Sequence, residues 1–376
     1  MLLVVAGLFI RSLNRAEHTS LGFEPEHVLN MMIDPHQIGY DEARTKTFYR
    51  ELERRARALP GVESASLSYT APMGFPSHAG PIYVEAHPLP SGRQPPVILF
   101  NSIDPAFFPT LRVPLLQGRR FSDADTETSR AVAIVNRTMA RKLWPNENPL
   151  GKRFSFQSAA GPFVEVVGVA SDGQYFFVSQ DSQPYFYVPL EQNYSSFRSL
   201  LIRTSGPPES LMTPIQDVLR TLAPDVPIFD LRTSEQMVHG IEGFLLFRLA
   251  ASLAAIMGSL GLVLAVMGVY GIVSFAVSGR TQEIGIRMAL GAEARDILQL
   301  VAREGLGLVM AGLLIGLLAA LALTRAMARL LIGISATDPV TYAMVAVLLS
   351  AVALAACWIP ARRALRVDPM VALRYE

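Results

Sequence analysis

The chain has 376 residues, of which 51% are hydrophobic and only 17% are charged. This composition excludes a disordered chain and argues against a single soluble domain, in which about 25% of residues are charged. The net charge of +1 gives no global field that would recruit nucleic acid, and the single cysteine, Cys357, excludes an intrachain disulfide and a cysteine-based zinc cluster.

The N-terminal segment is an apolar run, residues 1–10, which Arg11 and Arg15 terminate. Ten helical residues rise only about 15 Å, which is half of a bilayer. No basic residues precede the run and no small-x-small cleavage site follows it, so the pattern differs from that of a signal peptide. We interpret residues 1–13 as the C-terminal end of a spanning helix 1 whose first half is missing, as in a truncated gene product or a fragment.

Residues 14–240 mix helix-like and strand-like patterns, which indicates one α+β domain of two lobes. Residues 41–59 are predicted to form an amphipathic helix that Pro60-Gly61 ends. A second helix is predicted at 209–222, and the proline-rich residues 71–96 are predicted to form a long loop. Strands are predicted at 62–69, 97–103, 131–135, 164–170, 184–190, 199–203 and 226–231.

Two short helices are predicted to begin directly after strands. Asp104 is expected to cap a helix that contains Phe107 and Phe108. Asn136 is expected to cap a helix that runs to about residue 143.

The histidines of this region show no metal-binding or catalytic spacing. They are scattered among proline and glycine, without the HxH or HExxH patterns of metal sites, so we interpret them as solvated loop residues. They are His18, His27, His36, His78 and His87.

Other catalytic and cofactor motifs are also absent from the sequence. No GxSxG elbow frames a serine, and Asn146 stands where a phosphate loop ending in Gly151 would need glycine. Asp123, Asp125 and Glu127 alternate like calcium ligands, but the glycine and the distal glutamate of a calcium loop are missing, so a solvated turn is predicted. We therefore predict a chain that is not an enzyme and holds no cofactor or metal.

Three uncharged runs, 249–279, 305–324 and 339–361, are long enough to cross a bilayer. A spanning helix needs about 20 apolar residues to cover about 30 Å of hydrocarbon. We predict transmembrane helices at about 244–277, 304–325 and 339–360, within a membrane part that covers residues 241–376. None of these runs contains Asp, Glu, Lys or His, which argues against a proton relay or an ion site within them.

Two further features concern these helices. Residues 234–275 contain no proline and are predicted to form one continuous helix of about 63 Å, half of it beyond the bilayer, with a break at 240–243 as the alternative. Gly312, Gly316 and Ala320 lie on one helical face and allow close helix approach, so they are candidate helix-packing residues.

The distribution of arginines predicts how the chain is oriented in the membrane. The loop at 278–303 and the tail at 361–376 carry four arginines each, whereas 325–338 carries two. Because cytoplasmic loops are rich in arginine and lysine, the loop and the tail are expected inside and residues 14–240 outside. Within the loop, Glu283, Ile284, Arg287 and Leu290 have the spacing of a short amphipathic helix. Such a helix could also lie on lipid headgroups.

Six segments of the chain resemble the FtsX-like, MacB-type permease subunits of ABC transporters, especially the C-terminal half of duplicated permeases. They occur in the order of the family and extend over nearly the whole chain. They are 104–125 (DPAFFPTLRVPLLQGRRFSDAD), 132–154 (VAIVNRTMARKLWPNENPLGKRF), 164–172 (VEVVGVASD), 184–190 (PYFYVPL), 280–292 (RTQEIGIRMALGA) and 360–376 (PARRALRVDPMVALRYE).

The resemblance implies a four-helix permease unit, with helix 1 truncated here and a periplasmic α+β domain inserted between helices 1 and 2. It implies a multi-pass protein of the cell (inner) membrane that pairs with a second permease unit, either in a homodimer or in a duplicated chain. Its other implied partners are a cytoplasmic ABC ATPase, membrane lipid and a periplasmic adaptor. The ATPase contact maps onto the matching residues Glu283, Ile284, Gly285, Arg287, Ala289, Gly291 and Ala292.

The function expected from this resemblance is that of a noncatalytic permease subunit in an export or mechanotransmission complex. ATP hydrolysis by a separate ATPase would move the helices and, through them, the periplasmic domain. The alternative is a membrane-anchored extracytoplasmic sensor or scaffold without a transport role. A membrane-bound hydrolase would need a catalytic constellation, and the sequence shows none.

Overall fold

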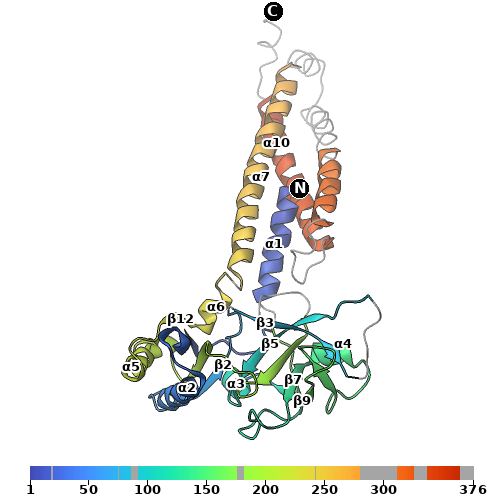
Figure 1. The fold of residues 1–376 in the computed structure, drawn as a ribbon. Helices are drawn as coiled ribbons and strands as arrows, with labels where there is room; N and C mark the ends of the chain where they lie inside the picture. Colours follow the sequence, from blue (N-terminus) through green and yellow to red (C-terminus); the bar gives the residue numbers. More distant parts are fainter. Residues whose placement is uncertain are drawn as a thin grey trace, which may run out of the picture. The chain divides into compact units, whose positions relative to one another are not determined.

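The computed structural model describes residues 1–17, 20–74, 76–85, 92–175, 182–241, 243–279, 311–325 and 337–364. Two compact units make up the chain, which Figure 1 shows as a ribbon. One consists of Met1–His18 together with Phe247–Glu376, and the other is Thr19–Leu246. The second unit is thus inserted in the sequence between two parts of the first.

A single 12-stranded sheet organises the inserted unit, with the order β12-β1-β11-β2-β5-β10-β7-β9-β8-β4; β3 pairs with β5 and β6 pairs with β9. Most neighbouring strands are antiparallel, but β10–β5 and β7–β9 are parallel pairs. The strands are β1 (Val28–Ile33), β2 (Val62–Ser68), β3 (His78–Pro81), β4 (Tyr83–Val84), β5 (Val97–Ile103), β6 (Leu115–Gly118), β7 (Val132–Asn136), β8 (Arg153–Ser155), β9 (Val164–Ala170), β10 (Tyr185–Pro189), β11 (Arg198–Thr204) and β12 (Ile228–Thr233).

The sheet divides into two lobes at the junction of β2 and β5. These strands pair only at Ser68 and Ile103, whereas β11 and β2 pair along most of their length. Each lobe has its own hydrophobic core, one around Tyr49 and Leu52 and the other around Trp144 and Phe186. Among the described strands, the junction therefore has the fewest paired positions.

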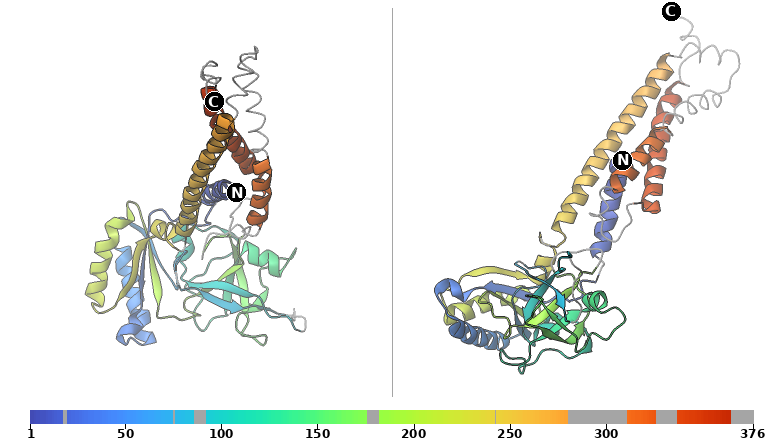
Figure 2. Two further views of the ribbon diagram at one scale, coloured as in Figure 1. Left: turned by 90° about the horizontal axis from the view of Figure 1, so that it is seen from above. Right: turned by 45° about the vertical axis from the view of Figure 1, so that its right-hand side comes forward.

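The first lobe packs two helices on β1, β11 and β2. They are α2 (Glu42–Arg57) and α5 (Met212–Leu222), which follows the short 3-10 helix η2 (Pro208–Leu211). Figure 2 (left) shows α2 in blue beside α5 in yellow-green. The Asp41 carboxylate accepts a hydrogen bond of 2.8 Å from the Arg44 amide, which caps α2. The amphipathic helix predicted for this region is confirmed.

The second lobe carries the short helices α3 (Phe107–Leu111) and α4 (Arg137–Leu143). Asn136 caps α4 as predicted, because its side-chain oxygen accepts hydrogen bonds from the amides of Met139 at 2.8 Å and Tyr185 at 3.0 Å. Asp104 accepts a hydrogen bond from the Ala106 amide at 3.0 Å, ahead of α3. The prediction that Asp104 caps α3 is nevertheless wrong, because the N-cap residue is Ala106 and no side chain caps this helix.

Three expectations for this unit were wrong. Residues 71–96 are not only a loop, because they contain β3 and β4. His78 lies in β3, half-buried, with its ring stacked on Tyr69 at 3.5 Å between ring centres, and burial lowers its pKa. Asp125 is buried and pairs with Arg119 at 2.7 and 2.8 Å, so the turn that contains it is not simply solvated. Each error arises from a partner that is not recognisable in the local sequence.

The described residues of the other unit form apolar helices. They are α1 (Leu2–Glu17), α7 (Leu245–Gly279), the helix Ala311–Arg325 and α10 (Pro339–Ala364). By length and composition, Arg248–Ile272 and Pro339–Ala356 could cross a membrane, and Leu2–Arg11 and Ala311–Arg325 are shorter apolar helices. The long helices have many outward-facing apolar side chains, as expected for helices surrounded by lipid.

The continuous helix predicted for 234–275 is wrong. The helix α6 (Ser234–Val238) begins with a capping box built by Thr233 and Gln236, and it ends before His239. The Phe244 amide then donates to the Val238 carbonyl at 2.9 Å, and α7 begins at Leu245. A side chain at Gly243 would overlap that same carbonyl, so the turn requires glycine there. The alternative, a break near residues 240–243, is correct.

Candidate functional site

The helices of the membrane-type unit share a small buried core. Val4 and Leu8 of α1 meet Ala320 and Val345, and each of these side chains is at most 7% exposed. Leu3, Leu317, Tyr342 and Leu349 pack around this cluster. Because Val4 and Val345 are far apart in the sequence, this core joins the N-terminal helix to the C-terminal part of the chain.

A polar contact reinforces the pairing of α1 and α10. The guanidinium of Arg11 forms an ion pair with Asp338, just before α10. The same carboxylate accepts hydrogen bonds from the Thr341 amide at 2.9 Å and the Thr341 hydroxyl at 2.6 Å, so Asp338 also caps the N-terminus of α10. One carboxylate therefore satisfies both an arginine from α1 and the exposed amides of a second helix.

The predicted helix-packing residues lie on the helix Ala311–Arg325 in three different environments. Ala320 is fully buried in the shared core. A Cβ on Gly316 would meet the Met1 nitrogen at 4.0 Å, and one on Gly312 would have no neighbour within 4 Å among the described residues. The structure thus brings Ala320, and at the edge Gly316, against α1.

Sequence reasoning missed Thr324, which lies one turn after Ala320 on the same face. Its hydroxyl donates to the Ala320 carbonyl at 2.8 Å and lies 2.9 Å from the Tyr342 hydroxyl of α10. Thr324 is 2% exposed, so this contact is inside the helical unit. The spacing of four residues from Ala320 is the signal that could have identified it.

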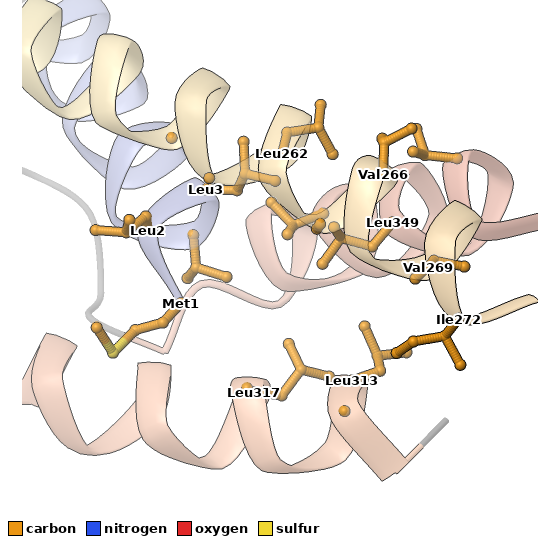
Figure 3. A pocket seen from close by; sticks show the side chains of 18 residues that line it. Met1, Leu2, Leu3, Leu262, Val266, Val269, Ile272, Leu313, Leu317 and Leu349 are labelled. Atoms are coloured by element: carbon orange, nitrogen blue, oxygen red, sulfur yellow. The ribbon is translucent and has the colours of Figure 1, made fainter. Parts of the chain in front are cut away.

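A cavity of about 600 Å³ opens between α1, α7, the helix Ala311–Arg325 and α10. Figure 3 shows side chains from these helices, among them Leu3, Val266, Leu313 and Leu349, around the cavity. All of the lining side chains are apolar. Among the described residues, no side chain that lines this cavity could carry a proton or bind an ion.

The predicted ATPase-contact residues lie outside the described residues. They are Glu283, Ile284, Gly285, Arg287, Ala289, Gly291 and Ala292. Among the residues that are described, no group of three or more His, Cys, Asp or Glu side chains could hold a metal ion.

In the inserted unit, a carboxyl pair marks the junction of the lobes. Asp104, which follows β5, accepts hydrogen bonds from the Ser66 hydroxyl at 2.6 Å and the Leu67 amide at 2.7 Å, both in β2. The carboxyl groups of Asp104 and Glu53 of α2 share a hydrogen bond. Glu53 also pairs with Arg57 at 2.5 Å. These contacts link α2, β2 and β5.

The two carboxyl groups influence each other's pKa. Burial and the charge of the nearby Asp104 raise the pKa of Glu53 to about 8, despite the neighbouring Arg57. Burial also raises the pKa of Asp104, although the hydrogen bonds from Ser66 and Leu67 oppose that rise. Because Asp104 accepts hydrogen bonds from Ser66 and Leu67, we expect Glu53 to be the member of the pair that is protonated at neutral pH.

Two family descriptions match the chain in succession. The MacB-like periplasmic core domain matches residues 1–222, and the FtsX-like permease C-terminal domain matches residues 255–369. The first match alone covers more than half of the chain. Together they extend over both the inserted unit and the apolar helices.

Curated relatives carry names of the same kind. The chain is 30% identical over 283 residues to the macrolide export ATP-binding/permease protein MacB of Marinobacter nauticus, covering 72% of this chain and 42% of that protein. It is 29% identical over 281 residues to the pyoverdine export ATP-binding/permease protein PvdT of Pseudomonas putida, again covering 72% of this chain and 42% of the relative. The matched part thus spans less than half the length of these relatives.

Among solved structures, the periplasmic region of MacB from Actinobacillus actinomycetemcomitans aligns with a TM-score of 0.41 and 16% identity, over 61% of this chain and 98% of that one. The extracellular domain of the ABC-type transporter YknZ from Gram-positive bacteria aligns with a TM-score of 0.35 and 17% identity, over 54% of this chain and 100% of that one. The two family matches carry the assignment: the chain belongs to the FtsX-like, MacB-type family of ABC transporter permeases.

Proposed function

We propose that this chain is the noncatalytic membrane subunit of an ABC-type export or mechanotransmission complex, worked by an ATPase on a separate polypeptide. The observation that carries the proposal is the order of the two family matches, a MacB-like core domain followed by an FtsX-like permease domain. The packing of α1 against α10 supports one permease unit built from both ends of the chain. The absence of a GxxxxGK[ST] motif agrees with a motor located elsewhere.

In this proposal the helices do not conduct the cargo. The apolar lining of the cavity between them supports this, since it offers no polar path. The four helical segments act as a lever in the cell membrane, with the inserted domain on the outer side and the loop at 278–303 in the cytoplasm. The chain pairs with a second permease unit, and membrane lipid surrounds the helices of both.

The ATPase contact is proposed for the cytoplasmic loop. Arg287 would pair with an acidic groove on the ATPase, while Ile284 and Met288 would supply apolar anchors. Movement of α7 would reach the inserted domain through residues 239–244, where the Phe244 amide is bonded to the Val238 carbonyl. This short turn would act as a joint rather than as part of a rigid rod. A periplasmic adaptor is a further proposed partner.

The test is a charge reversal in the loop. The variant Arg287→Glu should leave expression normal but reduce the binding of the purified ATPase partner at least tenfold and uncouple its ATP hydrolysis. Arg295→Glu, in the same loop but beyond the family motif, is the matched control and should behave like the wild type. If residues 280–296 can be scrambled without any effect on ATPase binding, the sensor or scaffold alternative is correct.

A further inference from the structure

A second cavity, of about 460 Å³, lies between the two lobes of the inserted unit. One wall is the face of α2 that carries Lys46, Tyr49 and Glu53. The opposite wall comes from the segments after β5, around Phe121 and after β10, and Arg198 also lines the space. No part of the proposed ATPase coupling uses this cavity.

Arg198 is a buried cation that forms no ion pair at contact distance among the described residues, although the charges of Glu191 and Asp104 act on it from farther away. Arg198 is only 4% exposed, and its Nε atom donates a hydrogen bond of 2.9 Å to the Ser195 carbonyl. The guanidinium also lies 4.8 Å from the centre of the Tyr49 ring and 5.8 Å from that of Tyr194. Within the described part of the chain, no ion pair or further hydrogen bond uses its two terminal nitrogens.

Four of the five carboxyl groups that line the cavity have other partners, and the fifth, Asp123, is exposed. Glu53 pairs with Arg57, Asp125 pairs with Arg119, and Glu191 lies 3.6 Å from Arg50. Asp104 accepts hydrogen bonds from β2. Burying a charge without a counter-ion is costly, and proteins normally provide a partner for it. Because Arg198 lines the cavity, a ligand bound there could supply the anion at contact distance.

We infer that this cavity binds a small organic carboxylate, whose carboxylate group pairs with the guanidinium of Arg198. A guanidinium presents two parallel N–H donors that match the two oxygens of a carboxylate. The apolar surfaces of Leu67, Phe121 and Leu190 also line the cavity and suit an apolar body attached to that group. An inorganic anion has no apolar part that could contact these surfaces.

The site is rigid on the arginine side. The Tyr49 hydroxyl donates in a bifurcated arrangement toward the carbonyls of Ile33 at 2.9 Å and Ser196 at 2.7 Å, so the ring beneath the guanidinium is fixed. A ligand there would touch α2 from the first lobe and the segment after β5 from the second. Its binding would therefore stiffen the junction at Asp104.

The experiment uses the full chain in detergent micelles, titrated with acetate, hexanoate and benzoate by calorimetry and by thermal unfolding. We expect saturable binding of hexanoate or benzoate, with affinity at least tenfold weaker in Arg198→Met. Arg220→Met removes an exposed arginine of α5 that does not line the cavity and should retain binding within about threefold. The proposal is overturned if none of the three carboxylates binds, or if binding is equal in Arg198→Met.

Two further readouts separate a binding role from a structural one. Without ligand, Arg198→Met should unfold at the same temperature as the wild type or higher, because an unpaired buried charge is removed. A clear loss of stability would identify Arg198 as a structural residue and overturn the assignment. If that variant does not fold, Arg198→Lys can replace it. Lysine keeps the positive charge but lacks the two parallel N–H donors of the guanidinium, so benzoate binding should still be weaker. Phosphate binding as strong as that of benzoate would also contradict the inference.

Discussion

Arg11 and Asp338 lie 327 positions apart in the sequence and form an ion pair that joins α1 to the start of α10. Arg11 lies within the part matched by the MacB-like core domain, and Asp338 within the part matched by the FtsX-like domain. The pair shows that the two family segments build one helical unit. Thr341, which bonds to the same carboxylate, makes this contact part of a helix cap.

Removing the Asp338 carboxylate should destabilise the helical unit. Asp338→Ala loses the cap, worth about 1 kcal/mol, and a partly exposed ion pair, worth about 0.5 kcal/mol. Asp338→Asn keeps an acceptor for the Thr341 amide and should recover most of the loss. Thermal unfolding in detergent measures both variants. Equal unfolding temperatures for Asp338→Ala and the wild type would contradict the role assigned to this residue.

Enlarging Ala320 should disrupt the shared core of the helices. Ala320 is 0% exposed and packs among Val4, Leu8 and Val345, so a leucine there would force the helices apart at a cost of about 1–3 kcal/mol. Ala319→Leu is the matched control, because Ala319 is exposed on the same helix and should tolerate the change. The unfolding temperatures of the two variants are compared. A similar response from both would show that this face is not tightly packed.

The turn between α6 and α7 should depend on Gly243. A methyl group there overlaps the Val238 carbonyl, so Gly243→Ala must displace the backbone, and we expect a loss of about 1–3 kcal/mol. Gly206→Ala has no atom within 4 Å of the added methyl group and serves as the control. Chemical denaturation of both variants gives the comparison. A gain of helix content without loss of stability in Gly243→Ala would instead support a continuous helix.

Stability should fall as pH rises, because of Glu53. Its pKa is about 8 in the folded chain, above the value of an exposed glutamate, so between about pH 4.5 and 8 the folded state binds more protons than the unfolded state. The stabilising contribution is complete below about pH 4.5, is lost as pH approaches 8, and does not change further above it. Glu53→Gln should flatten this dependence and be relatively more stable at high pH.

The measurement is the free energy of unfolding at pH 5, 7 and 9. Glu63→Gln is the control, since the Glu63 carboxylate makes only a surface contact with Arg112 at 3.6 Å. It should follow the pH dependence of the wild type. Parallel curves for Glu53→Gln and the wild type would rule out a raised pKa of Glu53 at the lobe junction.

Local signals in the sequence identified many elements correctly. The apolar stripe of α2, the Asn136 cap and the strand Val97–Ile103 depend on residues close together in the chain. The long apolar runs likewise indicate membrane helices through their length alone. By contrast, β1 (Val28–Ile33) was missed, because all six of its residues, including the polar Asn30, are buried, so its sequence lacks the alternation expected of a half-exposed strand.

The sequence by itself determined the segments: which were apolar enough for a membrane, which alternated as strands, and to which permease family they belong. These depend on periodicity, composition and capping, all of which act between residues a few positions apart. Only the tertiary structure decided that Arg11 meets Asp338, that Asp104 lies near Glu53 and raises its pKa, and that the helix breaks before Leu245. Those outcomes depend on burial and on partners distant in the chain, and a residue's local sequence does not specify either.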